Sequence, residues 1–164
     1  ILTIDGVDQS IYPPSKNGIW VNLLPNFKPK NVLILGMGGG TVATMLRKLY
    51  PNVKILGVES NTEIISLSQI DFGLEDNVIY GDAFKVVFKI KEKFDFILVD
   101  IWNGMWWPFE ALHFKFLNRC KRLLTRKGKL YINIPNIDFS IRNNLKKATY
   151  EDINSNRVIK WEKK

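Results

Sequence analysis

The sequence predicts an α/β fold with a doubly wound, mostly parallel β-sheet of the Rossmann-like type. Three observations support this prediction. From residue 31 onward, short apolar runs alternate with segments whose apolar residues have helical spacing. The apolar runs are continuous, which is typical of parallel strands that helices cover on both faces. A length of 164 residues with 46% hydrophobic residues is enough for one domain with a substantial core.

Residues 1–28 are expected to form a β-hairpin and a linker ahead of the main domain at residues 29–164. Asp5-Gly6 lies between two short β-prone runs, and this dipeptide is a strong signal for a tight hairpin turn. The stretch "YPPSKNG" then brings prolines and a glycine that interrupt regular structure.

The main domain is expected to contain five strand and helix pairs followed by a strand hairpin. Asn61 suits the N-cap of the second helix, Pro108 the first position of the fourth helix, and Gly128 the turn after it. The expected strands cover residues 31–36, 53–59, 77–82, 94–100 and 129–134, and the expected helices cover 41–50, 61–70, 83–90, 108–124 and 138–147. The two runs joined by "NSN" predict a C-terminal antiparallel hairpin of residues 148–153 and 157–163.

Candidate ligand-binding residues follow the strands, because parallel sheets of this kind bind ligands at the carboxyl ends of their strands. The first strand is followed by "GMGGGT", whose glycines allow a sharp turn and a close approach to a ligand. These glycines are Gly36, Gly38 and Gly40. Glu59 follows the second strand and suits the hydroxyls of a ribose, and Asp82-Ala83 follows the third and suits an adenine amino group. Taken singly, each acid is also typical of a helix cap or of a solvated loop residue.

The stretch "VDIWNGMWWP" places Asp100 at the end of the fourth strand, with three tryptophans just after it. Asp100 is the candidate catalytic residue, because it can accept a proton from a nucleophile or orient it. Trp102, Asn103 and Trp106 are candidates for the substrate side of the site. The alternative is that the tryptophans, Trp107 included, pack the loop onto the sheet or into a homodimer interface, since tryptophan is common in both settings.

Other ligand classes are disfavoured by the loops. A nicotinamide dinucleotide fingerprint needs a small third residue, and Thr41 occupies that position. A phosphate-binding loop of the GK[ST] kind is absent. The loop at Asp100 also lacks the Asp/Asn-Pro-Pro-aromatic pattern of enzymes that methylate amino groups of nucleic acids, which argues against adenine-N6 methylation.

These motifs together resemble class I methyltransferases, which bind S-adenosylmethionine, over residues 31 to about 161. Within that superfamily the chain more closely resembles the spermidine synthase family of aminopropyltransferases, at "TIDGVDQ", "VLILGMGGGTV", "GVES", "GDAF" and "FDFILVDIWN". The resemblance implies S-adenosylmethionine or its decarboxylated form as the cofactor. It also implies that Gln9 contacts the ligand, with Asp100 beside the reacting centre. By the same resemblance, Glu59 holds the ribose and Asp82 the adenine.

Some positions depart from the family's pattern. Gly39 stands where the family has the acid that grips the cofactor's amino group, and Asn103 stands where it has a second acid. The family's Tyr-His-Glu element after Gln9 is missing, and Tyr12 is the nearest candidate for the substrate side. Fewer acids attract a polyamine less strongly, so methyl transfer to an unidentified small-molecule acceptor is the first prediction. Aminopropyl transfer and a non-catalytic module that binds a nucleoside or a partner protein are the alternatives.

The C-terminal part of the chain carries the net charge of +8. Residues 1–118 hold 11 Lys and Arg against 12 Asp and Glu, whereas residues 119–164 hold 13 against 4. This basic C-terminal third can attract nucleic acid. A solvated, lysine-rich surface is the alternative interpretation.

Cys120 and His113 are the only residues of their types, so an internal disulfide is excluded and no Cys/His metal site or Cys-His catalytic pair is expected. A single cysteine fits a reducing compartment, and a cytoplasmic location is expected. No apolar run approaches the length that crosses a bilayer, and no signal-peptide pattern stands at the start. The chain opens on Ile1 rather than Met, which leaves its natural start undetermined.

Overall fold

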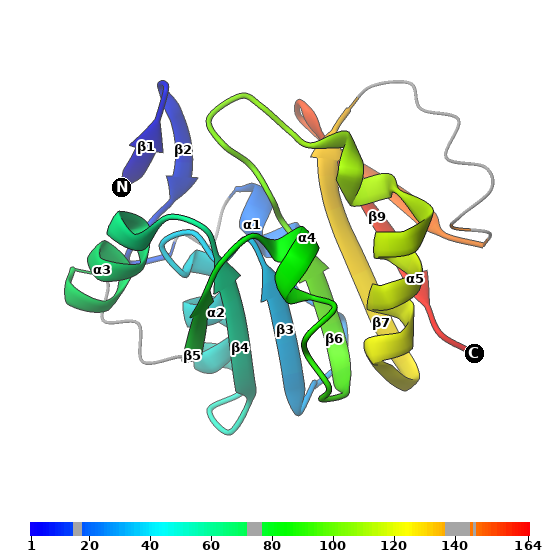
Figure 1. Ribbon diagram of the computed structural model, residues 1–164. Coiled ribbons are helices and arrows are strands. Elements are labelled where there is room, and N and C mark those ends of the chain that lie inside the picture. Colours follow the sequence, from blue (N-terminus) through cyan, green and yellow to red (C-terminus); the bar gives the residue numbers. More distant parts are fainter. Residues whose placement is uncertain (15–17, 72–76, 137–144, 146) are drawn as a thin grey trace.

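The computed structural model describes residues 1–14, 18–71, 77–136, 145 and 147–164 (Figure 1). Its helices are α1 (Ile19–Asn22), α2 (Thr41–Leu49), α3 (Thr62–Ile70), α4 (Ala83–Val86), the 3₁₀ helix η1 (Phe109–Leu112) and α5 (Phe114–Leu123). Its strands are β1 (Leu2–Ile4), β2 (Val7–Ser10), β3 (Asn31–Leu35), β4 (Lys54–Glu59), β5 (Asn77–Tyr80), β6 (Phe94–Val99), β7 (Leu124–Pro135), β8 (Thr149–Ile153) and β9 (Asn156–Glu162).

Strands β3 to β9 form one sheet in the order β5-β4-β3-β6-β7-β9-β8. The first five strands of that order pair in parallel, and β9 is antiparallel to both of its neighbours. The doubly wound, mostly parallel sheet and its C-terminal hairpin are therefore confirmed. β1 and β2 form the expected N-terminal hairpin, in which Asp5 and Gly6 take the positive φ angles, 51° and 77°, that a tight turn of this kind needs.

The strand order reverses between β3 and β6, because the chain winds from β3 outward to β4 and β5 and then returns to the other side of β3. At such a point the loops leave adjacent strands in opposite directions and open a crevice at the carboxyl ends. Here the crevice separates the loop after Leu35 from the loop after Val99, and the Asp100 N–H donates to the Leu35 carbonyl at 2.8 Å. This is the upper edge of the sheet in Figure 1, on the side of the β1–β2 hairpin.

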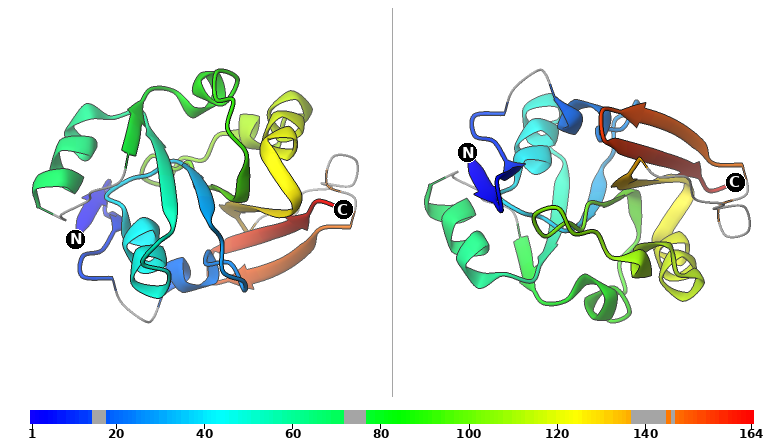
Figure 2. Two further views of the ribbon diagram at one scale, coloured as in Figure 1. Left: turned by 90° about the horizontal axis from the view of Figure 1, so that it is seen from below. Right: turned by 90° about the horizontal axis from the view of Figure 1, so that it is seen from above.

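Helices cover both faces of the sheet and give it two apolar cores (Figure 2). On one face, side chains of α2 join Val32 and Ile34 of β3 in a core, and on the other, side chains of α4 and α5 join Leu33 and Leu35. β3 is apolar throughout because its alternate residues enter different cores. Cys120 lies in the second core, where burial raises its pKa to about 12, so it is an inert packing residue.

The helix predicted over residues 108–124 is interrupted at His113, which is a correction to the sequence-based expectation. The backbone of His113 is extended, and its Nδ1 accepts the Lys115 N–H at 3.4 Å as the N-cap of α5. The segment before it is the short helix η1. The apolar spacing did not reveal this break, because a ring nitrogen that caps a helix leaves no mark on hydrophobic periodicity.

Other boundaries also differ from those expected. β7 begins at Leu124 rather than at residue 129, since Leu124 already pairs with Phe94 of β6, and Gly128 lies within the strand. α4 ends at Val86, and the short helix α1 was not expected. The helix predicted at 138–147 lies mostly outside the described residues. No helix in the described part of the chain is long and apolar enough to cross a membrane.

The end of β2 is fastened to the start of α2. The Gly39 N–H donates to Ser10 Oγ at 2.7 Å, and the Ile11 N–H donates to Thr41 Oγ1 at 2.8 Å. The side chains of Ser10 and Thr41 are buried. The N-terminal segment therefore contacts the glycine loop directly, while the domain division between residues 28 and 29 stays a prediction.

Candidate active site

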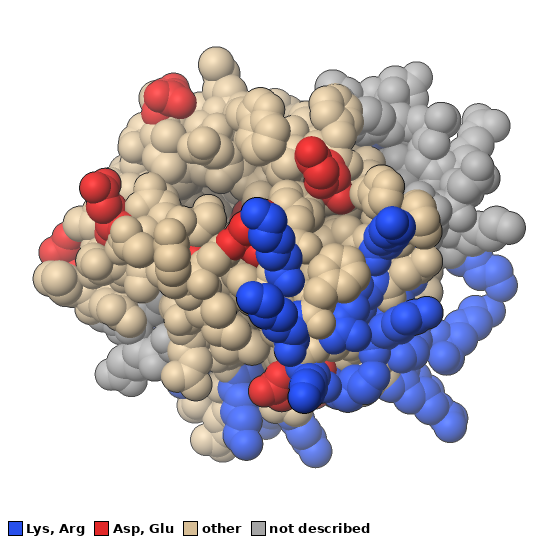
Figure 3. Space-filling view, viewed as in Figure 1, with Lys and Arg blue, Asp and Glu red and all other residues tan. Residues whose placement is uncertain are grey.

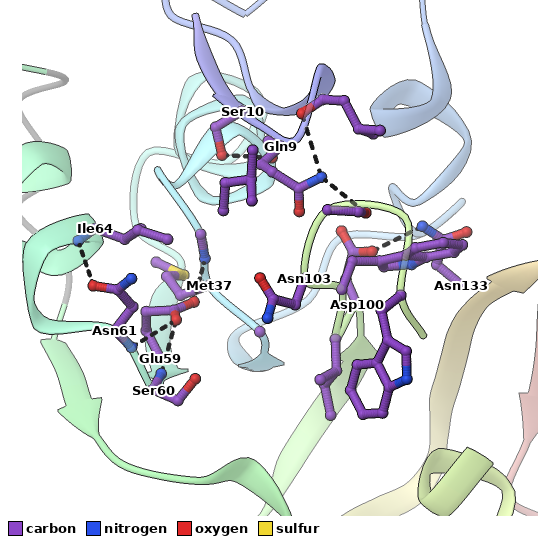
Figure 4. A pocket seen from close by; sticks show the side chains of 18 of the residues that line it. Gln9, Ser10, Met37, Glu59, Ser60, Asn61, Ile64, Asp100, Asn103 and Asn133 are labelled. Atoms are coloured by element: carbon purple, nitrogen blue, oxygen red, sulfur yellow. Dashed lines mark hydrogen bonds between the residues drawn. The ribbon is translucent and has the colours of Figure 1, made fainter. Parts of the chain in front are cut away.

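A large pocket opens at the carboxyl ends of the parallel strands, at the point where the strand order reverses (Figure 4). Its volume of about 1360 Å³ exceeds the range of about 300–1,000 Å³ that single-ligand pockets usually have. In Figure 4, Glu59, Ser60 and Asn61 form one side, here called the β4 side. Asp100 and Asn133 form the opposite side, here called the β6 side. The space between them is large enough for two substrates.

The glycine loop after β3 runs close to the backbone of the loop after β6. Gly36 has a φ of 89°, and a Cβ at this position would lie 2.2 Å from the Asp100 carbonyl oxygen. Only glycine fits such a position, because a side chain would both clash and strain the backbone. Gly38 and Gly40 also have positive φ angles, 53° and 84°, and Gly40 is the residue that precedes α2.

Gly36→Ala should destabilise the fold by about 2–4 kcal/mol, because the new Cβ meets the Asp100 carbonyl and alanine disfavours a positive φ. Urea denaturation measures the change. Gly6→Ala is the matched control, since Gly6 also has a positive φ but a Cβ there would meet no atom within 4 Å. Equal losses in the two variants would contradict the requirement for a close approach at Asp100.

Three backbone N–H groups hold Glu59, the last residue of β4. Its Oε2 accepts the Gly38 N–H at 2.9 Å, and its Oε1 accepts the N–H groups of Ser60 and Asn61 at 2.8 and 3.0 Å. An ionised carboxylate offers about four acceptor sites, so one remains for a ligand hydroxyl. Glu59 also ties the glycine loop to β4, a role that the sequence did not indicate.

Asp82, which follows β5, caps the short helix α4. Its Oδ1 accepts the Phe84 N–H at 2.9 Å, and its Oδ2 lies 3.5 Å from Lys85 Nζ. Asp82 and Ala83 both line the pocket. They lie on the β4 side, because they follow β5, which pairs with β4 and places Tyr80 opposite Glu59. The helix-cap interpretation and the ligand-binding one are therefore compatible, because the carboxylate keeps further acceptor capacity.

Asp100 lies directly after β6 and lines the pocket. Its Oδ1 accepts a hydrogen bond from Asn133 Nδ2 at 2.8 Å. Desolvation raises the pKa of Asp100 to about 6, and the hydrogen bond from Asn133 opposes this rise. At neutral pH the carboxylate is therefore ionised but more basic than a solvated aspartate, which suits a proton acceptor.

The loop after Asp100 folds back over the pocket and meets the N-terminal hairpin. Asn103 and Trp106 exchange two backbone hydrogen bonds of 3.0 Å, which close the loop into a narrow turn. At the tip, Gly104 has a φ of 58°, and a Cβ there would lie 2.7 Å from Asp5 Oδ2. Gln9 Nε2 lies 3.5 Å from the Gly104 carbonyl oxygen. The hairpin and the loop therefore contact each other and together line the pocket on the β6 side.

The three tryptophans of this loop have different surroundings. Trp107 is buried in the core, and its indole N–H donates to the backbone carbonyl of Asn133 at 3.1 Å, so of the two interpretations left open by the sequence, packing describes this residue. Trp106 is 61% exposed and lines the pocket. Trp102 lines the pocket while packing against the core, and its buried indole nitrogen has no hydrogen-bond partner among the described residues. Tyr12, also expected on the substrate side, is not among the residues that line the pocket.

Residues that the sequence did not single out complete the site. Ser10 holds the glycine loop, Asn133 holds Asp100, and Asn156 Nδ2 donates to Asn133 Oδ1 at 2.9 Å. Asn133 is 4% exposed and interrupts the apolar run of residues 130–134 in β7. A polar residue in a strand that is buried on both faces was the one signal in the sequence that could have found it.

The pocket is acidic although the chain is basic. Among the described residues, its lining includes five carboxylates and no Lys, Arg or His. The carboxylates belong to Asp8, Glu59, Glu63, Asp82 and Asp100. Lys and Arg gather instead over the lower part of the face that carries α4 and α5 (Figure 3). A cleft lined by one sign of charge concentrates ions of the opposite sign, so this pocket favours a cationic ligand.

Comparison with known proteins agrees with this geometry. The chain matches the spermine/spermidine synthase domain over residues 20–139. It is 33% identical over 144 residues to the polyamine aminopropyltransferase of Vibrio vulnificus (strain CMCP6), covering 79% of this chain and 46% of that protein. Human methyltransferase-like protein 13 in complex with SAH matches with a TM-score of 0.75 at 19% identity, covering 88% of this chain and 79% of that chain. A spermidine synthase in complex with the transition state analogue AdoDATO gives a TM-score of 0.67 at 19% identity, covering 87% and 57%.

The sheet order and the pocket at its switch point define an α/β domain of the class I methyltransferase type. Within that class, the chain belongs to the spermine/spermidine synthase family. It spans about half the length of the curated relatives that it matches, with 46% of one aminopropyltransferase covered and 44% of another.

Proposed function

We propose that the pocket binds S-adenosylmethionine, or its decarboxylated form, and that the protein transfers a group from the sulfonium of this cofactor to a small-molecule acceptor. The observation that carries this proposal is the position of Asp100, at the switch point of an acidic pocket. A sulfonium is a cation, so the five carboxylates attract it. The same lining disfavours a phosphate-bearing ligand.

The β4 side is the proposed nucleoside site. Glu59 is oriented by its three N–H donors and keeps an acceptor site for the ribose, and Asp82 and Ala83 lie where an adenine would follow. The N–H groups of Gly38 and Gly39 already donate to Glu59 and Ser10. They are therefore not offered to a phosphate, which argues against a dinucleotide.

Methyl transfer is the first candidate reaction. Gly39 leaves the glycine loop without an acid, so the carboxylate of S-adenosylmethionine meets no like charge from that residue. Aminopropyl transfer is the second candidate, and it is supported by the acidic lining, which suits a polyamine, and by similarity to polyamine aminopropyltransferases. Binding of nucleic acid through the basic C-terminal third of the chain stays a prediction.

Either reaction forms a bond between the acceptor's nucleophilic atom and the carbon next to sulfur. The carbon–sulfur bond breaks, its electron pair goes to sulfur, and a neutral thioether leaves. Because a sulfonium is already a good leaving group, the protein mainly aligns the nucleophile with the carbon. Asp100 accepts the proton that the nucleophile loses, or orients the nucleophile through a hydrogen bond.

A thermal-shift panel tests the cofactor assignment. We expect S-adenosylmethionine or its decarboxylated form, together with methylthioadenosine, to raise the melting temperature, because a ligand that binds only the folded state stabilises it by about 2.7 kcal/mol at 100 times its Kd. NAD at the same concentration should have no effect. Stabilisation by NAD alone would overturn the assignment. A stronger effect of the decarboxylated form than of the parent compound would favour aminopropyl transfer over methyl transfer.

A further inference from the structure

A chain of two carboxamides leads from the C-terminal hairpin to Asp100. Asn156, the first residue of β9, donates from Nδ2 to Asn133 Oδ1 at 2.9 Å, and Asn133 donates from Nδ2 to Asp100 Oδ1 at 2.8 Å. The chain crosses three adjacent strands of the sheet, from β9 through β7 to the end of β6. It therefore connects the last segment of the sequence to the candidate catalytic carboxylate.

Chemistry fixes the direction of these hydrogen bonds. An ionised carboxylate only accepts hydrogen bonds, so Asn133 has to turn its NH₂ group toward Asp100 and its carbonyl oxygen away. That oxygen then needs a donor, and the NH₂ group of Asn156 is the donor that meets it. Asn156 thus holds the amide of Asn133 in the one orientation that supports the charge on Asp100.

The backbone around these residues leaves little freedom. The Trp107 indole N–H donates to the backbone carbonyl of Asn133 at 3.1 Å. Next to Asn156, the Asn136 N–H donates to the backbone carbonyl of Ser155 at 2.7 Å. In the strand pairing, Asn156 lies opposite Pro135, two residues beyond Asn133. The two carboxamides are therefore held by rigid strands, which fixes the geometry of the hydrogen bond from Asn133 to Asp100.

We propose that Asn156 is a positioning residue for Asp100 and acts through Asn133, so that Oδ1 is held by the protein and Oδ2 is left for the nucleophile. Asp100 Oδ2 accepts no hydrogen bond from the described residues, and Asp100 lines the pocket. The inference rests on the proposed function for its catalytic meaning. The hydrogen-bond chain itself can be tested without any substrate.

The charged groups that share the pocket with Asp100 are all acidic. They are Asp8 from β2, Glu59 from β4, Glu63 from α3 and Asp82 ahead of α4. From β7 and β9, the groups that reach Asp100 or its partner are the neutral amides of Asn133 and Asn156. No Lys, Arg or His in the described lining offsets the charge, so the amide chain is the stabilising contact that substitution can remove.

The decisive substitution is Asn156→Asp, which keeps the size of the side chain but replaces the NH₂ donor with an acceptor. To meet the new carboxylate, Asn133 has to turn its NH₂ group toward residue 156 and present its carbonyl oxygen to Asp100. Asp100 then loses its hydrogen-bond donor. Burial already raises the pKa of Asp100 to about 6. In Asn156→Asp we expect the titration midpoint of Asp100 to lie higher than in the parent by about one pH unit or more. NMR of the side-chain carboxyl carbon measures this midpoint with neither cofactor nor acceptor present.

Two further variants separate the effect of the hydrogen bonds through Asn133 from the effect of added charge. Asn154→Asp adds the same charge to the same turn without a hydrogen bond to Asn133, so it should move the Asp100 midpoint only slightly. Asn156→Ala removes the donor without adding charge and should raise the midpoint by a smaller amount than Asn156→Asp. Amide NMR spectra of all three verify that the variants are folded.

The outcomes are distinguishable from failure of the proposed function. If neither Asn156 variant moves the Asp100 midpoint, or if Asn154→Asp moves it as far as Asn156→Asp, the positioning role is overturned. If the midpoint moves as expected but no transfer activity exists, the positioning role of Asn156 is supported and the proposed function fails. With an active enzyme, the acid limb of kcat/KM should shift together with the NMR midpoint, a response that a merely structural residue would not give.

Discussion

Asp100→Asn should lower the single-turnover rate by about 10²–10⁴-fold, the usual contribution of a general base, while cofactor affinity stays within about twofold. The amide keeps the size of the side chain, and its oxygen can still accept the hydrogen bond from Asn133. It cannot accept the proton of the nucleophile. Rapid-quench measurement of a single turnover, combined with calorimetric titration of the cofactor, separates the two effects.

The same substitution should also make the fold more stable at neutral pH. The pKa of Asp100 is raised from 3.8 to about 6 in the native state, so the native state binds the proton more tightly than the unfolded state does. Stability therefore falls as pH rises from about 4 to about 6 and stays lower above that range. The shift corresponds to about 3 kcal/mol at most, and the neutral amide is free of this cost. Asp100→Asn should thus gain about 1–3 kcal/mol at pH 7 and nothing below pH 4.

Asp8→Asn is the matched control for both measurements. Asp8 lines the same pocket but is exposed, and its Oδ1 contacts Thr3 rather than Asn133. Its loss changes the pocket charge by the same amount and should affect neither the chemical step nor the pH dependence of stability comparably. If Asp100→Asn turns over like the parent, Asp100 is not the proton acceptor.

The expectation that ligand-binding residues follow the strands located the β4 side of the site better than the β6 side. Glu59, Asp82 and Asp100 were chosen because each stands at or just after the end of a strand, and all three line the pocket. Asn133 was missed because it lies inside β7, and Asn156 because it begins a strand rather than ends one. Their importance comes from the pairing of β9 with β7, a contact across 23 residues of sequence that no local pattern encodes.

For the three tryptophans, the residue type alone does not predict which side chain faces the pocket and which packs in the core. The sequence left substrate contact and packing open for all three, since a large aromatic suits both. The structure separates them because the hydrogen-bonded turn at Asn103 and Trp106 decides which side chain faces the pocket and which turns into the core. At the tip of that turn, Gly104 lies against Asp5 of the N-terminal hairpin, which is again a long-range contact.

Glu59→Gln should weaken binding of methylthioadenosine or S-adenosylmethionine by about 10–100-fold, or about 1–3 kcal/mol. The glutamine oxygen can still accept the N–H groups of Ser60 and Asn61. Its NH₂ group then faces the Gly38 N–H, donor against donor, where the carboxylate had accepted a hydrogen bond of 2.9 Å. The glycine loop loses its tie to β4, and the ribose loses a charged acceptor. Isothermal titration calorimetry with each ligand measures the loss of affinity.

Glu63→Gln supplies the matched control for Glu59. Glu63 lines the same pocket and carries the same charge, but its backbone N–H is capped by Asn61 and its side chain does not hold the glycine loop. If charge alone attracts the cofactor, the two variants should weaken binding equally, and the effect should fade at high salt. If Glu59 acts through directed hydrogen bonds, its variant should lose much more affinity, at low and high salt alike. Normal affinity in Glu59→Gln would leave Glu59 as an anchor of the loop, and the ribose would need another partner on the β4 side.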